Sequence, residues 1–197
     1  KLKLYEEYKK NVKEYLKNKP NVKFVELKER GCLSNVIMEG LKHVDTKYVN
    51  IIQHDLMITR SFDVLSILKI MDDKKNNINL VRYVYKTNKW HQEFCRNECK
   101  DKLNDNDVKI INNIKFTKCN HFSDNNHIVS TDFYKKNLLP KLKKMSFPEY
   151  SLRCHPVVEN DYSFYYLGDI NDGNYIRHID GRCKRNKNCD IVPDQHT

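Results

Sequence analysis

The sequence predicts one α/β domain in which a mostly parallel sheet is flanked by helices and followed by a C-terminal β-hairpin. The chain has 197 residues, which is long enough for one well-buried core and short for two. Short apolar runs with β-branched residues alternate along it with segments whose apolar residues recur at helical spacing. No internal repeat or linker interrupts this order, so we expect residues 1–197 to form a single domain.

The first quarter of the chain alternates helix and strand signals. Residues 4–16 carry an apolar face at helical spacing, and residues 22–27 alternate like a short strand. A second helical pattern covers residues 33–44. Residues 48–53 then form a largely apolar run, as expected for a strand that is buried on both faces. Strand, helix and strand in this order predict a βαβ unit with two parallel strands.

Asp55 directly follows the second strand of this unit. The carboxyl ends of parallel strands meet at one edge of a sheet, where open α/β sheets bind their ligands. Arg30, which follows the first strand, should therefore share one crevice with Asp55. An aspartate in this place either holds a divalent cation that bridges two phosphates or only caps the next turn, and the position agrees with both interpretations.

Further helices and strands are predicted in the rest of the chain. Residues 86–118 show no clear period. The loop over residues 168–173, rich in Gly and Asp, is expected to join the last two strands as a hairpin. Thr131 is a plausible cap of the last helix. The predicted elements are helices over residues 62–71 and 131–139, and strands over residues 78–85, 162–167 and 174–179.

The composition of the chain limits which classes of partner and which cellular compartment we expect. The net charge of +10 favours a polyanion such as nucleic acid, an acidic membrane or a nucleotide diphosphate, but the lysines are spread along the chain. No apolar run reaches the roughly 18 residues of a membrane span. The seven cysteines are an odd number without tight framework spacing, which favours reduced thiols. We therefore expect a cytoplasmic protein, in the host cytoplasm if the chain is viral.

The segment from residue 22 to residue 55 resembles the middle of a family-2-like glycosyltransferase of the GT-A fold. In that family a strand and a glycine-containing loop lead into a helix carrying Asn, and the next strand ends in an Asp-x-Asp-like motif that binds the metal and the sugar nucleotide. Asn35 matches the helix residue and Asp55 the last acid, whereas Gln53 replaces the first acid. The resemblance implies a nucleotide-sugar donor and Mn²⁺ or Mg²⁺ as cofactor. The implied donor site consists of Arg30, Asn35, Gln53, His54 and Asp55.

The family begins with a strand that cradles the nucleotide base, so we expect either that this strand lies upstream of Lys1 or that the site is incomplete. Residues 122–128 are similar to the acceptor-side segment of related viral and bacterial glycosyltransferases. An inverting transfer needs a general base that takes the proton of the acceptor hydroxyl, and Asp124 is the candidate. His127 is expected to orient this base or to bind the acceptor. An ordinary turn or helix cap at Asp124 remains the alternative.

Residues 166–182 resemble the C-terminal hairpin of these enzymes. The resemblance implies that His178 completes the metal shell opposite Asp55, although an Asp-Gly pair at a strand end is also common in plain turns. Arginines near the cleft are candidates for bidentate contacts to the diphosphate. The further candidates in this segment are Asp180 for the metal, and Arg177 and Arg182 for the diphosphate.

A function of another class is a non-catalytic basic binding module for nucleic acid or acidic glycan. His91, Cys95 and Cys99 lie at helical spacing and are candidates for structural zinc, although no partner pair occurs at finger spacing. Tyr83, Tyr85 and Trp90 lie near basic residues and are candidates for stacking on bases. A degenerate transferase is a third interpretation. The leading one is a metal-assisted glycosyltransferase that acts on a glycan or another hydroxyl acceptor, with nucleic acid not expected as a partner.

Overall fold

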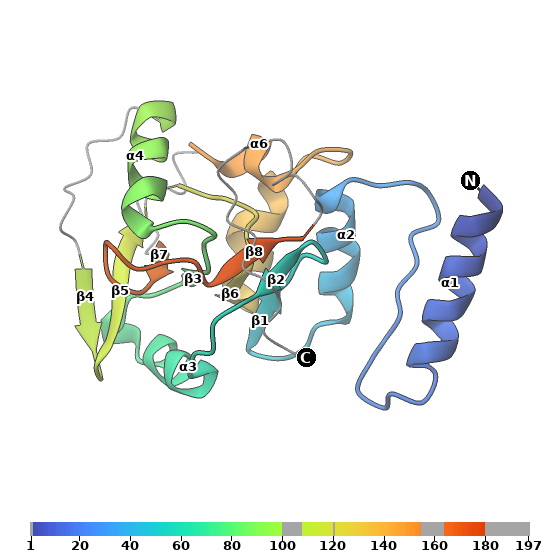
Figure 1. The fold of residues 1–197 in the computed structure, drawn as a ribbon, viewed down its shortest axis with the longest axis horizontal. Helices are drawn as coiled ribbons and strands as arrows, with labels where there is room; N and C mark the ends of the chain where they lie inside the picture. Colours follow the sequence, from blue (N-terminus) through green and yellow to red (C-terminus); the bar gives the residue numbers. More distant parts are fainter. Residues whose placement is uncertain (1, 100–107, 120, 155–163, 180–197) are drawn as a thin grey trace, which may run out of the picture.

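The computed structural model describes residues 2–99, 108–119, 121–154 and 164–179, and a mixed six-stranded sheet lies at its centre (Figure 1). Its strand order is β1-β6-β3-β7-β5-β4, and a smaller sheet pairs β2 with β8. The strands of the large sheet are β1 (Tyr48–Ile51), β3 (Leu80–Arg82), β4 (Val108–Ile111), β5 (Ile114–Cys119), β6 (His127–Ser130) and β7 (Phe164–Leu167). The strands of the small sheet are β2 (Leu56–Ile58) and β8 (Ile176–His178).

The structure contains the predicted helices and two further helices that the sequence did not predict. Helices over residues 4–16, 33–44 and 62–71 are confirmed within a few residues, and α4 and α6 lie where no helix was predicted. The predicted helix over residues 131–139 is also present, but its cap is Ser130, whose Oγ accepts from the N–H of Phe133 at 3.3 Å. The helices are α1 (Leu2–Leu16), α2 (Leu33–Gly40), α3 (Val64–Asp72), α4 (Asn88–Cys99), α5 (Thr131–Phe133) and α6 (Pro148–Leu152). A π-helical turn (Tyr134–Leu138) and a 3₁₀ turn (Leu139–Lys141) continue α5.

Strand direction differs from the prediction. Among the described strands of the large sheet, β3 and β7 run parallel and the other four pairs are antiparallel. The α/β class is confirmed, whereas the mostly parallel sheet is wrong. The reason is that residues 22–27 join neither sheet, so no βαβ unit forms with β1. The neighbour of β1 is instead β6, which runs antiparallel to it and to β3.

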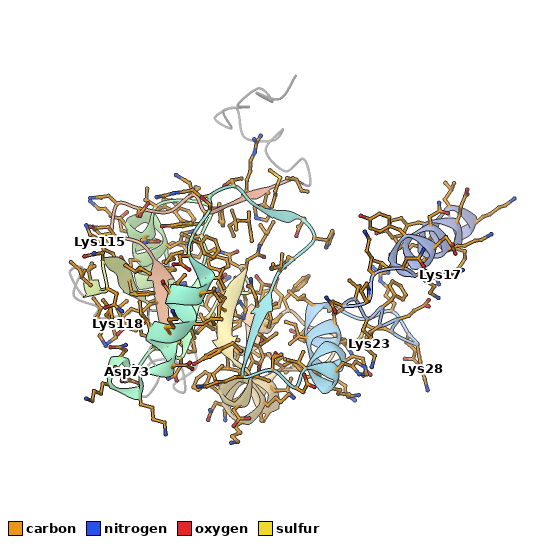
Figure 2. The ribbon with its side chains drawn as sticks, turned by 90° about the horizontal axis from the view of Figure 1, so that it is seen from below. Lys17, Lys23, Lys28, Asp73, Lys115 and Lys118 are labelled. Carbon is orange, nitrogen blue, oxygen red and sulfur yellow. The ribbon has the colours of Figure 1, made fainter. Side chains whose placement is uncertain are left out.

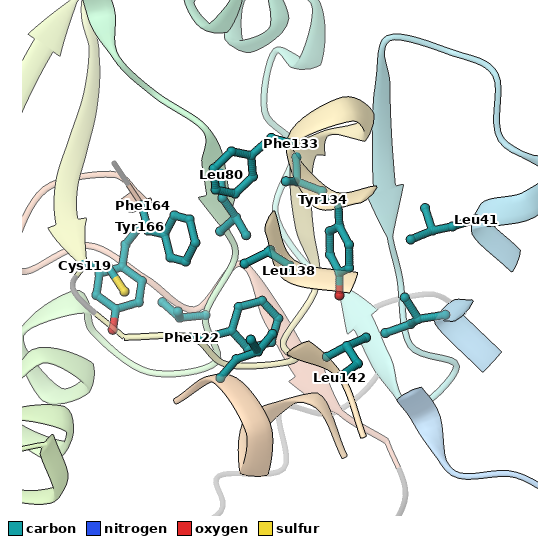
Figure 3. Packing of buried hydrophobic residues seen from close by; sticks show 14 residues of the cluster. Leu41, Leu80, Cys119, Phe122, Phe133, Tyr134, Leu138, Leu142, Phe164 and Tyr166 are labelled. Carbon is teal, nitrogen blue, oxygen red and sulfur yellow. The ribbon is translucent and has the colours of Figure 1, made fainter. Parts of the chain in front are cut away.

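Alternating side chains of the central strands form two cores, one on each face of the large sheet. In β7, Phe164 and Tyr166 point to one face, and Tyr165 and Leu167 to the other, as the two-residue period of a strand requires. The first core is closed by α2 and the helical segment after β6 (Figure 3), and the second by α3 and the small sheet. Strands β3, β6 and β7 therefore contribute to both cores.

The structure corrects the predicted burial of one strand and the predicted pairing of two others. β1 is an edge strand of the large sheet and is half-buried, so it is not buried on both faces. The strands predicted over residues 162–167 and 174–179 are present as β7 and β8, but they do not pair with each other. β7 lies between β3 and β5, whereas β8 pairs with β2. The glycine-rich loop therefore connects two sheets instead of closing a hairpin.

This loop also holds the start of α4. The backbone N–H groups of Asn88 and Lys89 donate to the carbonyls of Asp172 and Ile170, both at 2.7 Å. The buried Asn88 side chain donates to the carbonyl of Asp169 at 2.7 Å. These contacts satisfy N–H groups that a helix start leaves without intrahelical partners. The loop thereby fixes the helix that carries one wall of the cavity described below.

Helix α1 differs from the rest of the fold in its position and in the exposure of its side chains. The helix lies apart from the sheet, on the far side of α2 (Figure 1). Its tyrosines are exposed, and Lys9 and Lys13 both pair with Glu26, at 2.8 and 2.7 Å. Figure 2 shows Lys17, Lys23 and Lys28 at this end of the molecule and Lys115 and Lys118 at the opposite end, so the positive charge is distributed over the molecule.

Two findings concern the expected compartment. In the described part of the chain, no helix has the length and apolar character that crossing a membrane requires. Cys154 takes part in a disulfide bond, so the expectation of reduced thiols is wrong at this position. Cys32 and Cys119 are free thiols. Cysteine spacing missed this bond because pairing depends on distances in space.

Gly173 provides a test of the loop that holds α4. Its φ is +147°, and a Cβ there would lie 2.0 Å from the Lys86 carbonyl oxygen. Gly173→Ala is therefore expected to lower the free energy of unfolding by about 3 kcal/mol through backbone strain and overpacking. Gly40→Ala is the control, because nothing lies within 4 Å of its added Cβ and the residue is helical. It should raise stability by roughly 0.5–1 kcal/mol, and urea denaturation curves that coincide would contradict this account.

Candidate active site

A cavity of about 340 Å³ opens beside the carboxyl end of β1, between the turn after that strand and helices α4 and α6. Four predicted site residues line it, namely Gln53, Asp55, Asp124 and His178. They come from the turn after β1, the segment before β6 and strand β8. The fold therefore gathers on one cavity residues that are widely separated in the sequence.

The turn that carries Asp55 is held by the buried side chain of Asn126. Its Oδ1 accepts from the N–H of Gln53 at 2.9 Å, and its Nδ2 donates to the carbonyl of Leu56 at 2.8 Å. The carbonyl of Asn126 accepts from the N–H of Tyr83 at 2.9 Å, which connects the same residue to the end of β3. One carboxamide thus fixes both ends of the turn to the sheet.

Gln53 links the two predicted halves of the site. Its Nε2 donates to the backbone carbonyl of Asp124 at 2.5 Å. A carboxylate has no proton to donate, so an acid at this position would leave that carbonyl without this bond. The residue that departs from the Asp-x-Asp-like pattern is therefore a hydrogen-bond donor that joins the Asp55 turn to the Asp124 segment.

Asp55 and His178 face each other across the cavity. Asp55 Oδ2 lies 3.9 Å from His178 Nδ1, and the two side chains are only 13% and 22% exposed. The carbonyl of Asp55 accepts from the N–H of Ile179 at 3.0 Å, which joins the turn to β8. The ring of Tyr85 packs edge-on against His178, with centroids 5.3 Å apart.

The spacing of this pair is compatible with a divalent cation. Ligand atoms lie about 2.1 Å from Mg²⁺, so two ligands of one ion are roughly 3–4 Å apart. His178 Nδ1 is buried and makes no hydrogen bond within the described part of the chain. No third His, Cys, Asp or Glu of the described residues completes a cluster, so phosphate oxygens and water would have to fill the other positions.

Asp124 lies in the cavity wall with a perturbed acidity. Burial, and then the negative charge and hydrogen bond of Glu149, raise the pKa of Asp124 to about 7, while the charge of Arg82 opposes them. A carboxyl group with this pKa exists in both protonation states at neutral pH. It is therefore suited to accept a proton from a bound hydroxyl group.

Glu149, from the first turn of α6, is held by several donors. Its Oε1 accepts from Ser123 Oγ and from the N–H of Asp124 at 3.3 Å, and its Oε2 accepts from Arg153 Nη2 at 2.7 Å. Burial alone would raise the pKa of Glu149, but the hydrogen bonds from Ser123 and Arg153 outweigh it and lower that pKa. The two adjacent carboxyl groups therefore differ in proton affinity.

A buried arginine lies behind this wall. Arg82 at the end of β3 is fully buried, and its Nη2 donates to the carbonyl of His121 at 2.9 Å. Burial, then the Arg82 charge, lowers the pKa of His121 well below its ordinary value and that of His91 to about 3. Both histidines of the cavity floor are therefore neutral at neutral pH.

Four aromatic side chains, which we call the aromatic rim, line the outer part of the cavity. Trp90 and Phe94 of α4 stack with centroids 5.4 Å apart and an interplanar angle of 12°. Phe147 and Tyr150 of the α6 region meet edge to face at 5.9 Å. Phe94, Phe147 and Tyr150 are 39%, 47% and 78% exposed, so their faces are open to a ligand.

Three residues of the predicted donor site lie away from this cavity. Arg30 and Asn35 line another cavity, of about 760 Å³, so the prediction that Arg30 and Asp55 share one crevice is wrong. The reason is that residues 22–27 do not enter the sheet and cannot deliver Arg30 to its edge. Asn35 Oδ1 accepts from the N–H of Met145 at 2.8 Å. His54 is exposed in the turn beside Asp55.

His127 lies inside the first core instead of on the cavity. The residue is fully buried, its Nδ1 donates to the carbonyl of Asn125 at 2.6 Å, and its ring stacks on Tyr134 at 6.0 Å. Burial lowers the pKa of His127 to about 4, so the ring is neutral at neutral pH. Arg177 lies in β8, while Asp180 and Arg182 lie outside the described residues.

Of the three residues of the zinc hypothesis, the structure describes the side chain of His91. His91 packs against the rings of Tyr85 and Trp90 and lines the cavity. The side chains of Cys95 and Cys99 lie outside the described part of the chain. Within that part, no three potential ligands gather as a metal site.

The sequence predictions included Trp90 as a stacking residue but missed Asn126, Glu149 and the other three members of the aromatic rim. Asn126 lies within the segment that drew attention to Asp124, but an asparagine in a polar run gives no sign of being buried. Pro148 followed by Glu149 is typical of a helix start. That signal places a helix there, but it does not show that the helix meets Asp124.

Comparison with known proteins adds one finding to this geometry. The model of the family described as Glycosyl transferase family 2 matches residues 6–138. The match includes the turn with Asp55 and the segment with Asp124, and it ends before Glu149 and His178. No curated protein and no solved structure matches the chain.

The Asn126 contacts predict a stability effect that can be localised. Asn126→Ala removes the partners of a half-buried N–H at Gln53 and a buried C=O at Leu56, so the free energy of unfolding should fall by about 2–4 kcal/mol. The amide of Gln53 should also exchange with deuterium faster. Asn18→Ala is the control, because Asn18 is exposed. Unchanged exchange at Gln53 in Asn126→Ala would contradict the assigned contact.

Proposed function

The chain belongs to glycosyl transferase family 2, and on that premise we propose that it transfers a sugar from a nucleotide-sugar donor to a hydroxyl group of a glycan at the cavity beside β1. The family match and the mixed sheet flanked by helices agree with the GT-A-like fold that the sequence predicts. One observation carries the proposal for this site, which is that Asp55 and Asp124 lie on the same cavity. A donor-side carboxylate and a carboxyl group able to accept a proton are the two groups that such a transfer needs.

Asp55 and His178 form the donor side of the proposal. Their 3.9 Å separation agrees with Mn²⁺ or Mg²⁺ between them, and the family commonly uses a divalent metal. When bound, such a cation offsets the charge of the diphosphate leaving group. The Asn126 contacts hold the Asp55 turn in place before the donor arrives, so little reorganisation is needed on binding.

Asp124 forms the acceptor side. In an inverting transfer its carboxylate takes the proton of the acceptor hydroxyl while that oxygen bonds to the anomeric carbon of the donor sugar. The bond from the anomeric carbon to the phosphate oxygen breaks, and its electron pair leaves with the nucleoside diphosphate. The raised pKa of Asp124 makes this carboxylate a stronger base than an exposed aspartate.

The aromatic rim supports a glycan as the acceptor. Exposed aromatic faces beside polar groups suit a sugar ring, which has an apolar face of C–H groups and an edge of hydroxyls. The rim combines such faces with the polar groups of Ser123, Asn125 and Asp124 on the same cavity. A purely apolar acceptor would cover these polar groups without offering them a hydrogen bond in place of water.

Asp55 gives the first test of the proposal. Thermal unfolding with UDP, GDP and TDP, each with and without Mn²⁺, should show a metal-dependent rise in Tm for at least one nucleotide. Asp55→Asn should abolish this rise while leaving the Tm of the free protein nearly unchanged. Asp45→Asn is the matched control, because Asp45 precedes the same strand and is exposed.

Two results would argue against the donor site. If no nucleotide raises the Tm but oligonucleotides bind with a steep salt dependence, the basic binding module replaces the transferase. If Asp55→Asn retains the full metal-dependent rise, the cation is held elsewhere.

Tyr150 gives a test of the acceptor. Tyr150→Ala should raise the KM for p-nitrophenyl glycoside acceptors about tenfold, or ~1.4 kcal/mol, with kcat little changed, because a stacking surface is lost. Tyr15→Ala is the control, since Tyr15 is 72% exposed on α1, away from the cavity. Equal KM values for both variants would remove the rim from the acceptor site.

A further inference from the structure

Glu149 lies beside the proposed base but has no place in the transfer as described so far. We propose that Glu149 is the positioning residue of Asp124: it keeps the negative charge of the carboxyl pair, so that the exchangeable proton resides on Asp124, the member that exchanges it with the acceptor hydroxyl. This inference rests on the proposed function for its role in catalysis, but its proton placement stands on the geometry of the pair alone.

The hydrogen bonds divide the two carboxyl groups into different roles. Glu149 accepts from the Ser123 hydroxyl, the Asp124 backbone N–H and the Arg153 guanidinium, so both of its oxygens have donors. Donors of this kind stabilise a charged carboxylate and disfavour its protonation. Asp124 instead meets a carboxylate in a buried setting, and repulsion between adjacent charges favours a proton there.

Both residues have backbones that the fold restrains. Asp124 is tied to the turn after β1 by the Gln53 side chain, at 2.5 Å. Glu149 lies in the first turn of α6, where a carboxylate also meets the positive end of the helix. Arg153, one turn later in the chain, binds the same carboxylate at 2.7 Å. The pair therefore joins the sheet edge to α6 through charge as well as packing.

The other ionisable groups near Asp124 do not replace Glu149 in this role. Arg82 from β3 opposes protonation of Asp124, so it cannot be the group that places the proton there. Tyr134 is buried, which raises its pKa and keeps it neutral. Among the described residues, the other ionisable side chains that line this cavity are those of Arg153 after α6 and of Asp55, Tyr85, His91, His121, Tyr150 and His178.

The consequence is a pH dependence that Glu149 sets. The transfer needs Asp124 ionised, so its rate rises as the pH passes upward through the pKa of this group. Removing the neighbouring charge makes Asp124 easier to ionise, which moves that rise to lower pH. The same change makes Asp124 a weaker base, so the plateau at high pH should fall. A residue that only supports the fold would lower the rate equally at every pH.

Titration of the carboxyl carbons by ¹³C NMR tests the proton placement without a substrate. In the wild-type protein one carboxyl group should titrate near pH 7, and its signal should vanish in Asp124→Asn. In Glu149→Gln the Asp124 titration should move down by about one pH unit or more, a tenfold or larger change in proton affinity. Glu93→Gln is the control, because Glu93 is exposed on α4, and it should leave the midpoint unchanged. An Asp124 midpoint that stays near 7 in Glu149→Gln would overturn the proposal.

A second variant keeps the test usable if Glu149→Gln fails to fold. Ser123→Ala removes one donor from Glu149 but retains both carboxyl groups, so the Glu149 titration should move upward. No movement in this variant would also overturn the proposal. If the Asp124 and Glu149 titrations shift as expected but no donor supports sugar transfer, the proposed function is contradicted. If sugar transfer occurs but these titrations do not shift, only the role of Glu149 is contradicted.

Discussion

The cavity depends on one buried carboxamide. Asn126 uses both ends of its side chain on the two ends of the Asp55 turn, and its backbone pairs with the end of β3. A buried amide with all of these partners is stable only in one arrangement, because any shift of the turn leaves an N–H or C=O unsatisfied. The position of Asp55 therefore follows from a residue that lies 71 positions away and never lines the cavity.

The other walls of the cavity are formed by elements that packing and a few hydrogen bonds hold in place around the Asp55 turn. β6 follows Asn126 directly and contributes to both cores, so the Asn126 contacts are anchored on a strand that is packed on both faces. The loop before β8 holds the start of α4 through backbone carbonyls, and α4 carries Trp90 and His91 to the cavity. α6 reaches the same place through the Glu149 contacts. Packing fixes the frame, and a few hydrogen bonds fix the polar groups within it.

Local patterns in the sequence predicted the helices and strands better than they predicted which strands pair with each other. Residues 62–71 and 78–85 have a clear period and gave α3 and β3, whereas β6 follows a polar run that reads as a turn and was missed. The strand predicted over residues 22–27 joins neither sheet, so it gives β1 no parallel neighbour and does not bring Arg30 to the sheet edge beside Asp55. Asp55, Asp124 and His178 were placed on one cavity because the resemblance to the family supplied their partnership. Glu149 was out of reach, since nothing local relates residues 25 positions apart.

Gln53 shows how a departure from a motif can carry information. In an Asp-x-Asp-like pattern its position holds an acid, which would place a second carboxylate at the donor side. Here the side chain donates to the backbone carbonyl of Asp124. In the proposed function, a neutral group therefore couples the donor turn to the segment of the base, and Glu149 provides a second carboxylate beside Asp124. Under the proposed function, two adjacent carboxyl groups lie at the base and one carboxylate lies at the metal, so these residues control proton transfer more than metal affinity.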